Sequence, residues 1–548
     1  MKRCPDCRRD YFDDSLLYCL DDGSALLEGP STAEQHTITS PDTPRETAVF
    51  AKKRSISSDF PTEVIDPSKL PTFGAVNSIA VLPFANISRD ADTEYFSDGL
   101  AEELLNVLSK IHGIRVAART SAFSFKNKSA TVPEIGQALN VASIVEGSIR
   151  MVGERIRIAV QLVNVADGFQ IWSDTYDRTM SDIFAIQDDI AQSVVEELRT
   201  RLIGEERREE ISKKVISEVA EAVRGRTSDP EAQRLLLLGR YFLDRTTRDD
   251  TAKAIDYFHQ ALRLDPDFAL CWAELGRAFS IEAGRGWKSV KAGYARSRDA
   301  ALRAVTLDPE LAEGYAQLGR VQISYDWDLK SAEQSYEKAV EFAPGSSSVL
   351  DGAAVLMYKL GRLNQALELV RLALAQDPLS AAIWHNLGLI AHASGLLSES
   401  ETAFRKALEL APQRIVSGSL LALVLSDQGK VDEGIDQTNR EPDKFWRSWA
   451  RVILFQKTGQ HSESGEILEE ILEKFSDGNA YQIAEIYSML GESDNAFEWL
   501  GRALTERDPG LTHAKVNPRF KSLHVDTRWS ELLAKIGFGN DEPKALNS

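Results

Sequence analysis

Apolar and polar residues follow two different periods along residues 78–202. Short apolar runs such as SIAVLPF, residues 78–84, predict strands because β-branched and aromatic residues dominate them and a proline ends them. In YFSDGLAEELLNVLSKI, Leu100, Leu104 and Leu108 recur on one face of a helix. Continued to residue 202, the pattern gives the order βαβαβββα, which predicts an α/β domain with a mixed sheet.

A second pattern occupies residues 229–507, where helical segments recur at a fixed distance. A dipeptide ending in proline marks the end of a helix at spacings of 43, 35, 34 and 34 residues. A period of 34 residues is that of the tetratricopeptide repeat, in which each repeat is a helical hairpin. The early excess predicts an insertion near GRGWKSV, residues 284–290. The five dipeptides are Asp265-Pro266, Asp308-Pro309, Ala343-Pro344, Asp377-Pro378 and Ala411-Pro412.

A glycine followed five residues later by a small residue extends this array beyond the last proline. The marker occurs five times between residues 361 and 496, which brings the expected number of hairpins to about eight. Residues 508–548 are expected to form a capping helix and a tail. Such an all-α solenoid presents a concave groove that binds a protein or peptide. Arg320 and Asn386 occupy candidate groove-facing positions, with ordinary solvated surface as the alternative.

The first residues carry a candidate metal site. Cys4, Cys7, Cys19 and Asp22 have the spacing of two knuckles, and thiolates with a carboxylate satisfy the tetrahedral preference of Zn²⁺. Asp21 is an alternative fourth ligand. Residues 1–27 resemble the short zinc ribbons that begin many bacterial regulatory proteins, although the second knuckle lacks their proline. The resemblance implies a structural zinc ion; the alternative is a tail with three free thiols.

Two segments connect these parts. Residues 28–75 are rich in Ser, Thr, Pro and acidic residues and lack apolar periodicity, which predicts a disordered linker. Residues 203–228 are expected to be a connecting helix or linker. The chain is thus predicted to be multidomain: a small zinc ribbon, an α/β domain and a tetratricopeptide solenoid.

Residues 78–202 also resemble a known family. SIAVLPFANIS, EYFSDGLAEELLNVLSK and VEGSIRMVGERIRIAVQLVNVADGFQIWSDTYDR are similar to the TolB-like amino-terminal, or FlgO-like, domain. In bacterial proteins that domain commonly precedes tetratricopeptide repeats, and the family supplies no catalytic motif. Polar or aromatic residues near the predicted strand ends could hold a small ligand; the alternative is an ion pair between the arginine and the aspartate, with the tryptophan in the core. These residues are Asp98, Arg119, Thr120, Ser121 and Trp172.

The composition and the missing motifs exclude several classes of function. The net charge of −19 disfavours broad contact with nucleic acid or anionic lipid. Four cysteines, no secretory leader and no apolar run near the ~18 residues of a membrane span predict a cytoplasmic protein. No nucleotide, protease, esterase or kinase motif is present, so no enzyme is expected. His385 and His392 lie seven apart, but packing or surface is expected rather than metal binding.

The leading hypothesis is a non-enzymatic scaffold in bacterial signalling or regulation, whose repeats bind a partner protein and whose α/β domain either senses a signal or self-associates. A transcription-related regulator that uses the zinc ribbon is one alternative. A small-molecule sensor that uses the α/β domain is another. The sequence leaves the partner and the signal open.

Overall fold

The computed structural model describes residues 78–88, 94–111, 113–152, 155–179, 183–203, 208–222, 227–245 and 247–538, together with three short strands near the N-terminus. The chain divides into two compact units, Met1–Leu70 and Pro71–Ser548. In the first unit, β1 (Lys2–Arg3) pairs antiparallel with both β2 (Asp10–Tyr11) and β3 (Leu27–Glu28).

The predicted zinc ligands of the first unit lie outside the described residues. This holds for Cys4, Cys7, Cys19 and Asp22, and for the alternative ligand Asp21. The expected linker also lies outside them, apart from its first residue. The zinc ribbon and the linker therefore stay predictions.

The sheet of the second unit is mixed, as the sequence predicts. Its strand order is β6-β4-β7-β8-β9, and β5 also pairs with β7. The pairs that β4 and β5 form are parallel, whereas β7, β8 and β9 form an antiparallel meander. The strands are β4 (Ser78–Val81), β5 (Ala85–Asn86), β6 (Arg115–Val116), β7 (Ser143–Val152), β8 (Arg155–Asn164) and β9 (Gln170–Thr179).

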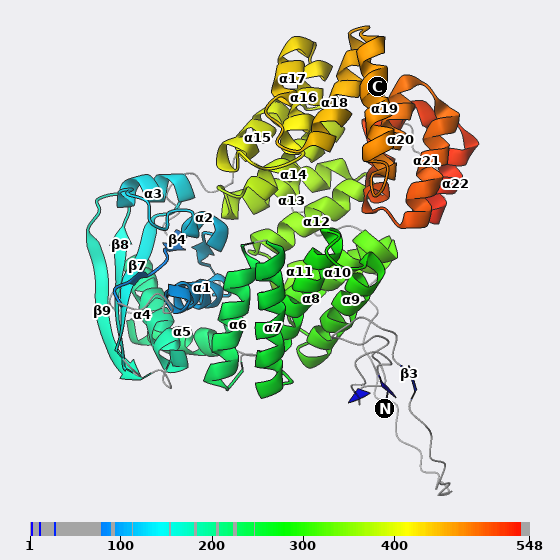
Figure 1. The fold of residues 1–548 in the computed structure, drawn as a ribbon. Coiled ribbons are helices and arrows are strands. Elements are labelled where there is room, and N and C mark those ends of the chain that lie inside the picture. Colours follow the sequence, from blue (N-terminus) through cyan, green and yellow to red (C-terminus); the bar gives the residue numbers. More distant parts are fainter. Residues whose placement is uncertain are drawn as a thin grey trace, which may run out of the picture. The chain divides into compact units, whose positions relative to one another are not determined.

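Helices pack on both faces of this sheet (Figure 1). The alternation along β4 explains how: Ile79 and Val81 point into one core, whereas Ala80 and Leu82 point into the other. The first core holds α1, with its predicted leucine face buried, and also α4 and α5. The second core holds α2 and α3. The bounds are α1 (Glu94–Ser109), α2 (Arg119–Phe123), α3 (Val132–Leu139), α4 (Ile183–Ile203) and α5 (Arg208–Ala222).

Helix α5 lies in the segment expected to be a connection. Its residues Ile211, Val215 and Val219 are buried in the core that α1 and α4 share. The α/β domain therefore extends to Ala222, twenty residues past the predicted boundary, because the apolar face of α5 needs this core to cover it.

Sixteen helices then pair into eight hairpins, the number that the sequence predicts. The sequence insertion appears as the lengthened pair α8 and α9. The hairpins are α6 (Pro230–Leu243) with α7 (Arg248–Leu264), α8 (Ala269–Gly284) with α9 (Val290–Leu307), α10 (Ala312–Val321) with α11 (Leu329–Phe342), α12 (Ser347–Leu360) with α13 (Leu363–Gln376), α14 (Ala381–Ala393) with α15 (Leu397–Leu410), α16 (Ser417–Asp427) with α17 (Val431–Thr438), α18 (Lys444–Lys457) with α19 (His461–Lys474), and α20 (Ala480–Leu490) with α21 (Ser493–Glu506).

The glycine marker has a physical basis in the later hairpins. The glycine turns the chain between the two helices with a positive φ, for example 83° at Gly429. The small residue that follows lets the second helix approach the first. At Gly434 an added Cβ would lie 2.6 Å from the carbonyl oxygen of Ala422. At the corresponding Ser464, the hydroxyl donates to the carbonyl of Val452 at 3.0 Å.

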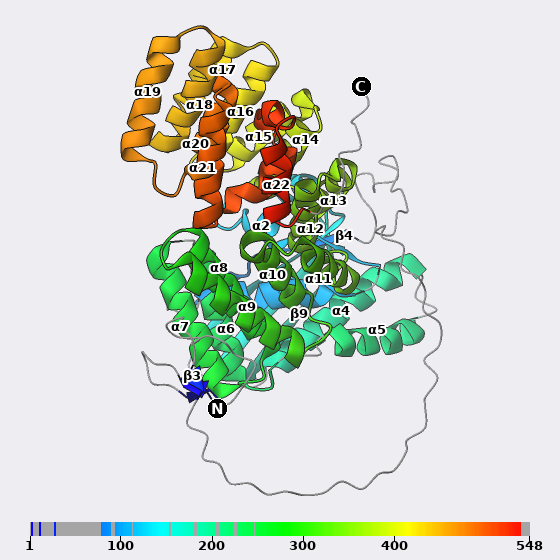
Figure 2. The same ribbon diagram turned by 90° about the vertical axis from the view of Figure 1, so that its right-hand side faces the viewer.

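The C-terminal segment covers the last hairpin and also reaches back along the array (Figure 2). It consists of the 3₁₀ helices η6 (Pro509–Val516) and η7 (Pro518–Leu523) and of α22 (Thr527–Lys535). Phe520 packs between Tyr481 and Trp529. Helix η6 packs against α12 and against η5 (Gln322–Asp326), a π-helical turn that continues α10.

Candidate functional site: the inner face of the repeats

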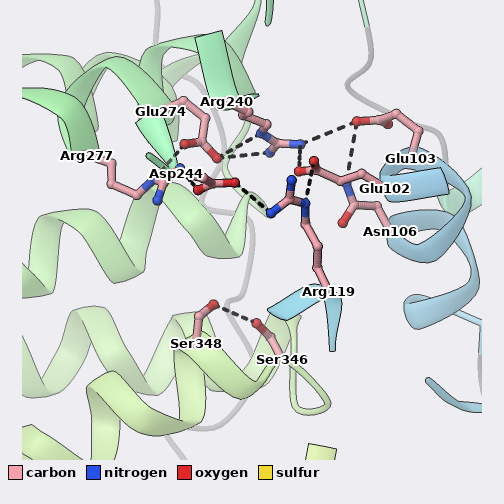
Figure 3. A network of polar contacts seen from close by, with 10 residues as sticks. All are labelled: Glu102, Glu103, Asn106, Arg119, Arg240, Asp244, Glu274, Arg277, Ser346 and Ser348. Atoms are coloured by element: carbon pink, nitrogen blue, oxygen red, sulfur yellow. Dashed lines mark hydrogen bonds and ion pairs between the residues drawn. The ribbon is translucent and has the colours of Figure 1, made fainter. Parts of the chain in front are cut away.

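The first helices of the array bind the α/β domain through a buried arginine. The guanidinium of Arg240 in α6 is held by Glu274 of α8 at 3.0 Å, and by Glu102 and Glu103 of α1 at 3.2 and 3.4 Å (Figure 3). All four side chains are buried or nearly so. A buried charge requires such partners because water no longer solvates it. Arg240 therefore joins the domain to the first two hairpins.

The charges of this network change the protonation of its members. Burial tends to raise the pKa of Glu274, but Arg277 and Arg240 outweigh it and lower that pKa to about 2. Burial dominates at Glu102 and raises its pKa, although Arg119 and Arg240 oppose it. Burial tends to lower the pKa of Arg240, but the surrounding carboxylates outweigh it and raise that pKa. Because the members of the network come from the three helices α1, α6 and α8, the network fixes how these helices pack.

A second arginine extends the network to the edge of the interface. Arg119 begins α2, and its guanidinium lies 2.8 Å from Glu102 and 2.6 Å from Asp244, just after α6. It also lies 4.4 Å from the ring centre of Phe123. Arg277 of α8 continues the chain of charges to Asp244 at 3.6 Å (Figure 3).

The loop between the fourth and fifth hairpins contacts the start and the middle of α2. The hydroxyl of Ser121 donates to the carboxylate of Asp377 and accepts from the backbone N–H of Leu379 at 2.8 Å. The N–H of Ala118 donates to the carbonyl of Gln376 at 2.8 Å. Leu379 packs against the core beneath α2. The proline-ended dipeptide at Asp377 thus ends a helix and also contacts the domain.

These contacts involve several residues of the ligand site that the sequence suggests on the α/β domain. Arg119 and Ser121 bind the repeats, and Thr120 also acts on Asp377. Asp98 pairs with Lys126 at 2.6 Å rather than with Arg119. Trp172 is partly buried against the core, as its structural alternative predicts. The structure therefore places three of the five residues at an interface with the repeats.

Of the two groove-facing candidates, Asn386 contacts the carboxylate of Asp351, and Arg320 acts on that carboxylate through its charge. The amide of Asn386 in α14 donates to both oxygens of Asp351 in α12, at 2.9 and 3.0 Å. Burial raises the pKa of Asp351, and the charge of Arg320 in α10 opposes that rise. Arg320 is exposed. Three successive first helices thus contribute to one polar group.

Sequence reasoning missed Asp351, Glu274 and Arg240, although a signal for them exists. Arg240 and Glu274 lie 34 residues apart, and Asp351 and Asn386 lie 35 apart. Complementary polar residues one period apart on first helices come to face each other when the hairpins stack. A search for such pairs in successive repeats would have found both of these contacts.

The two histidines of α14, His385 and His392, also contact residues on the next first helix. His385 is partly buried and shares a hydrogen bond of 2.8 Å with Ser417, and His392 pairs with Asp427 at 2.8 Å. Each partner lies on the next first helix. Across the part of the chain that the structure describes, no group of three His, Cys, Asp or Glu residues is arranged to hold a metal ion. Both histidines thus contact residues of the next first helix.

The comparisons with known proteins include a match to the tetratricopeptide repeat family. The family model described as tetratricopeptide repeat matches residues 353–415. The protein named "Putative adenylate cyclase 3" from Rhizobium meliloti (strain 1021) is 37% identical over 210 residues, which are 38% of this chain and 33% of that protein. The CTR9 homolog of Arabidopsis thaliana is 24% identical over 222 residues, 38% of this chain and 20% of that protein. The chain thus spans a third or less of these curated relatives.

Solved structures resemble the array at low identity. They include PilF of Pseudomonas aeruginosa, with 17% identity and a TM-score of 0.31 over 38% of this chain and 92% of that one. A monomeric IFIT1 mutant with Gppp-AAAA gives 14% identity and a TM-score of 0.40 over 59% of this chain and 87% of that one. The C-terminal region consists of tetratricopeptide repeats. Among the described residues, no helix has the length and apolar character to cross a membrane.

Proposed function

We propose that the chain is a non-enzymatic scaffold in bacterial signalling or regulation, whose repeats bind a partner protein through their first helices. Tetratricopeptide repeats generally bind protein partners. One observation carries the proposal: the first helix α6 already binds a folded domain in this chain, through Arg240 and the carboxylates of Glu102 and Glu103 in α1. A face that binds the α/β domain in this way has the side chains to bind a second protein farther along.

The remaining parts have supporting roles in this proposal. The α/β domain is of the TolB-like, or FlgO-like, type and is the element through which the chain self-associates. Residues 1–27 hold a structural zinc ion through Cys4, Cys7, Cys19 and Asp22. The protein acts in the cytoplasm and catalyses no reaction.

A quantitative pull-down with full-length variants tests the scaffold. Arg320→Glu reverses an exposed charge on the first-helix face, beside the Asp351–Asn386 pair. Arg405→Glu reverses a comparably exposed charge on α15, a second helix, and is the matched control. Bound proteins are identified by mass spectrometry, and each candidate partner is then titrated as a purified protein.

The proposal predicts that a partner is bound by the wild type and by the control but at least about tenfold more weakly by Arg320→Glu. Loss of binding in both variants would point to the outer face of the array. Equal binding in all three would remove the repeats' inner face from the mechanism. Circular dichroism verifies that the variants remain folded.

A further inference from the structure

The six-stranded sheet of the α/β domain has one long open edge. Strands β6 and β9 lie at its two ends. Strand β6 is two residues long, and the guanidinium of its Arg115 donates to the carbonyl of Ala375 in the repeats at 3.3 Å. Strand β9 is ten residues long, and among the described residues only β8 pairs with it (Figure 1). A long edge presents backbone groups that a further strand can bind.

Two backbone groups of β9 are held by charged side chains of the same strand. The N–H of Thr175 donates to the carboxylate of Asp174 at 2.7 Å, so it points away from β8 and toward the open edge. Asp177, two residues on, has its backbone on the same side, and its carbonyl accepts from the guanidinium of Arg178 at 3.1 Å. Asp174 and Arg178 therefore occupy the hydrogen-bonding positions that a neighbouring strand would fill.

These contacts lie at the surface, where another strand can replace them. Asp174, Thr175, Asp177 and Arg178 are all exposed. Charged side chains on an edge ordinarily discourage pairing with another strand. Asp174 and Arg178, however, have opposite signs and lie on the same face of β9, because their positions differ by an even number of residues. An antiparallel strand with the same sequence can therefore match both charges.

One register of β9 against a second β9 satisfies all of these groups. When the antiparallel pair is centred on Tyr176, Asp174 of each copy lies opposite Arg178 of the other. Thr175 then lies opposite Asp177, so the N–H of Thr175 can donate to the carbonyl of Asp177 in the second copy. The two backbone groups that Asp174 and Arg178 hold within one chain would thus bond to each other. The two released side chains would form ion pairs between the copies.

The neighbouring registers lack this match of charges. Centred on Asp174 or on Asp177, the pair would place two carboxylates of the same residue opposite each other, which is unfavourable. Centred on Thr175, Asp174 would meet Tyr176 instead of Arg178. The charge pattern of β9 therefore selects the register centred on Tyr176.

We propose that β9 pairs antiparallel with β9 of a second copy of this chain, in the register centred on Tyr176. The sheets of the two α/β domains would then join across a two-fold axis. This inference rests on the self-association proposed above and names the surface that produces it. The surface belongs to the α/β domain and does not use the first helices of the repeats.

Sedimentation velocity of the full-length protein over a wide range of concentrations tests the pairing. The variants are Asp174→Lys, the double variant Asp174→Lys with Arg178→Asp, and Glu210→Lys as the matched control on an exposed acid of α5. The wild type and the control should form dimers alike. Asp174→Lys should weaken dimerisation about tenfold or more, because two ion pairs become two repulsive pairs. The double variant should restore it, since each lysine again faces an acid.

The outcomes separate the surface from the self-association itself. A wild type that stays monomeric throughout would overturn both. Dimerisation of unchanged strength in Asp174→Lys would leave the self-association and overturn the role of β9. A double variant as weak as the single one would overturn the pairing of Asp174 with Arg178. Circular dichroism verifies that each variant remains folded.

Disulfide cross-linking tests the register directly. Residues at opposed positions without mutual backbone hydrogen bonds, such as Asp174 and Arg178 in this pairing, are close enough for a disulfide. A mixture of Asp174→Cys and Arg178→Cys chains should form a covalent dimer on mild oxidation, and mass spectrometry should find the two introduced cysteines linked. A link between introduced cysteines in either variant alone, or none in the mixture, would contradict the register.

Discussion

Replacing Lys359, near the end of α12, by methionine should stabilise the protein. Methionine keeps the length and most of the apolar contacts of the lysine stem but removes the ammonium. Lys359 as a whole is 6% exposed and has Arg320 as its charged neighbour. The substitution therefore removes an unfavourable charge and leaves no cavity.

The magnitude follows from the lowered pKa. A fall from 10.5 to about 7 makes the protonated form unfavourable in the folded state, and at 1.36 kcal/mol per unit this costs roughly 4 kcal/mol at neutral pH. The unfolded chain stays protonated up to the higher value. Between pH 7 and 10.5 the unfolded state thus binds more protons, and wild-type stability rises with pH. Below pH 7 the full cost applies.

Urea unfolding at pH 6, 7.5 and 9 measures the effect. The unfolding midpoint of Lys359→Met should exceed that of the wild type at pH 6, and the gain should shrink as the pH rises. Lys406→Met, on the exposed face of α15, should differ little from the wild type at every pH. A variant less stable than the wild type at pH 6, or a gain that does not change with pH, would refute the reasoning.

Four further outcomes are expected. Arg240→Met should lower the free energy of unfolding by about 3–5 kcal/mol in urea titrations, because it removes the cation that three buried carboxylates share, and Arg119 and Arg277 remain only for Glu102 and Glu274. The pKa of Glu274 is about 2 in the folded protein and 4.5 in the unfolded chain, so its charge stabilises the fold above pH 4.5. This stabilisation is lost as the pH falls from 4.5 toward 2. Over that range the thermal midpoint should therefore fall more steeply in the wild type than in Glu274→Gln. Gly434→Val should lower the thermal midpoint, since its Cβ would collide with the carbonyl of Ala422, whereas a valine at the open Gly465 should do so less. Elemental analysis of the purified protein should find about one zinc per chain, and Cys19→Ser should reduce that content.

The helices of the array could be predicted because their signals are local. Prolines end second helices, and glycines such as Gly429 adopt the positive φ that a tight turn needs. The leucine face of α1 is likewise a property of one short segment. In each case the sequence neighbours alone determine the backbone that forms.

The candidate site could not be predicted in the same way because its partners are distant in the sequence. Arg240 and Glu102 lie 138 residues apart, and Ser121 and Asp377 lie 256 apart. In the sequence alone each of these side chains has the pattern of an ordinary surface residue, because only tertiary packing brings its partner close. The period of the repeat could have suggested the Asp351–Asn386 pair, but nothing local shows that Lys359 is buried.

The return of the C-terminal segment to the middle of the array has a consequence for how the repeats unfold. In an open solenoid each hairpin touches only its neighbours, so the end can fray one repeat at a time. Here Arg507 donates to the carbonyl of Tyr325 at 2.7 Å, and Gly537 leaves no room for a Cβ beside the carbonyl of Trp327. These contacts join hairpin three to the segment that follows hairpin eight. Separating any of hairpins three to eight breaks this closure, so this part of the array should melt as one cooperative unit rather than from its end.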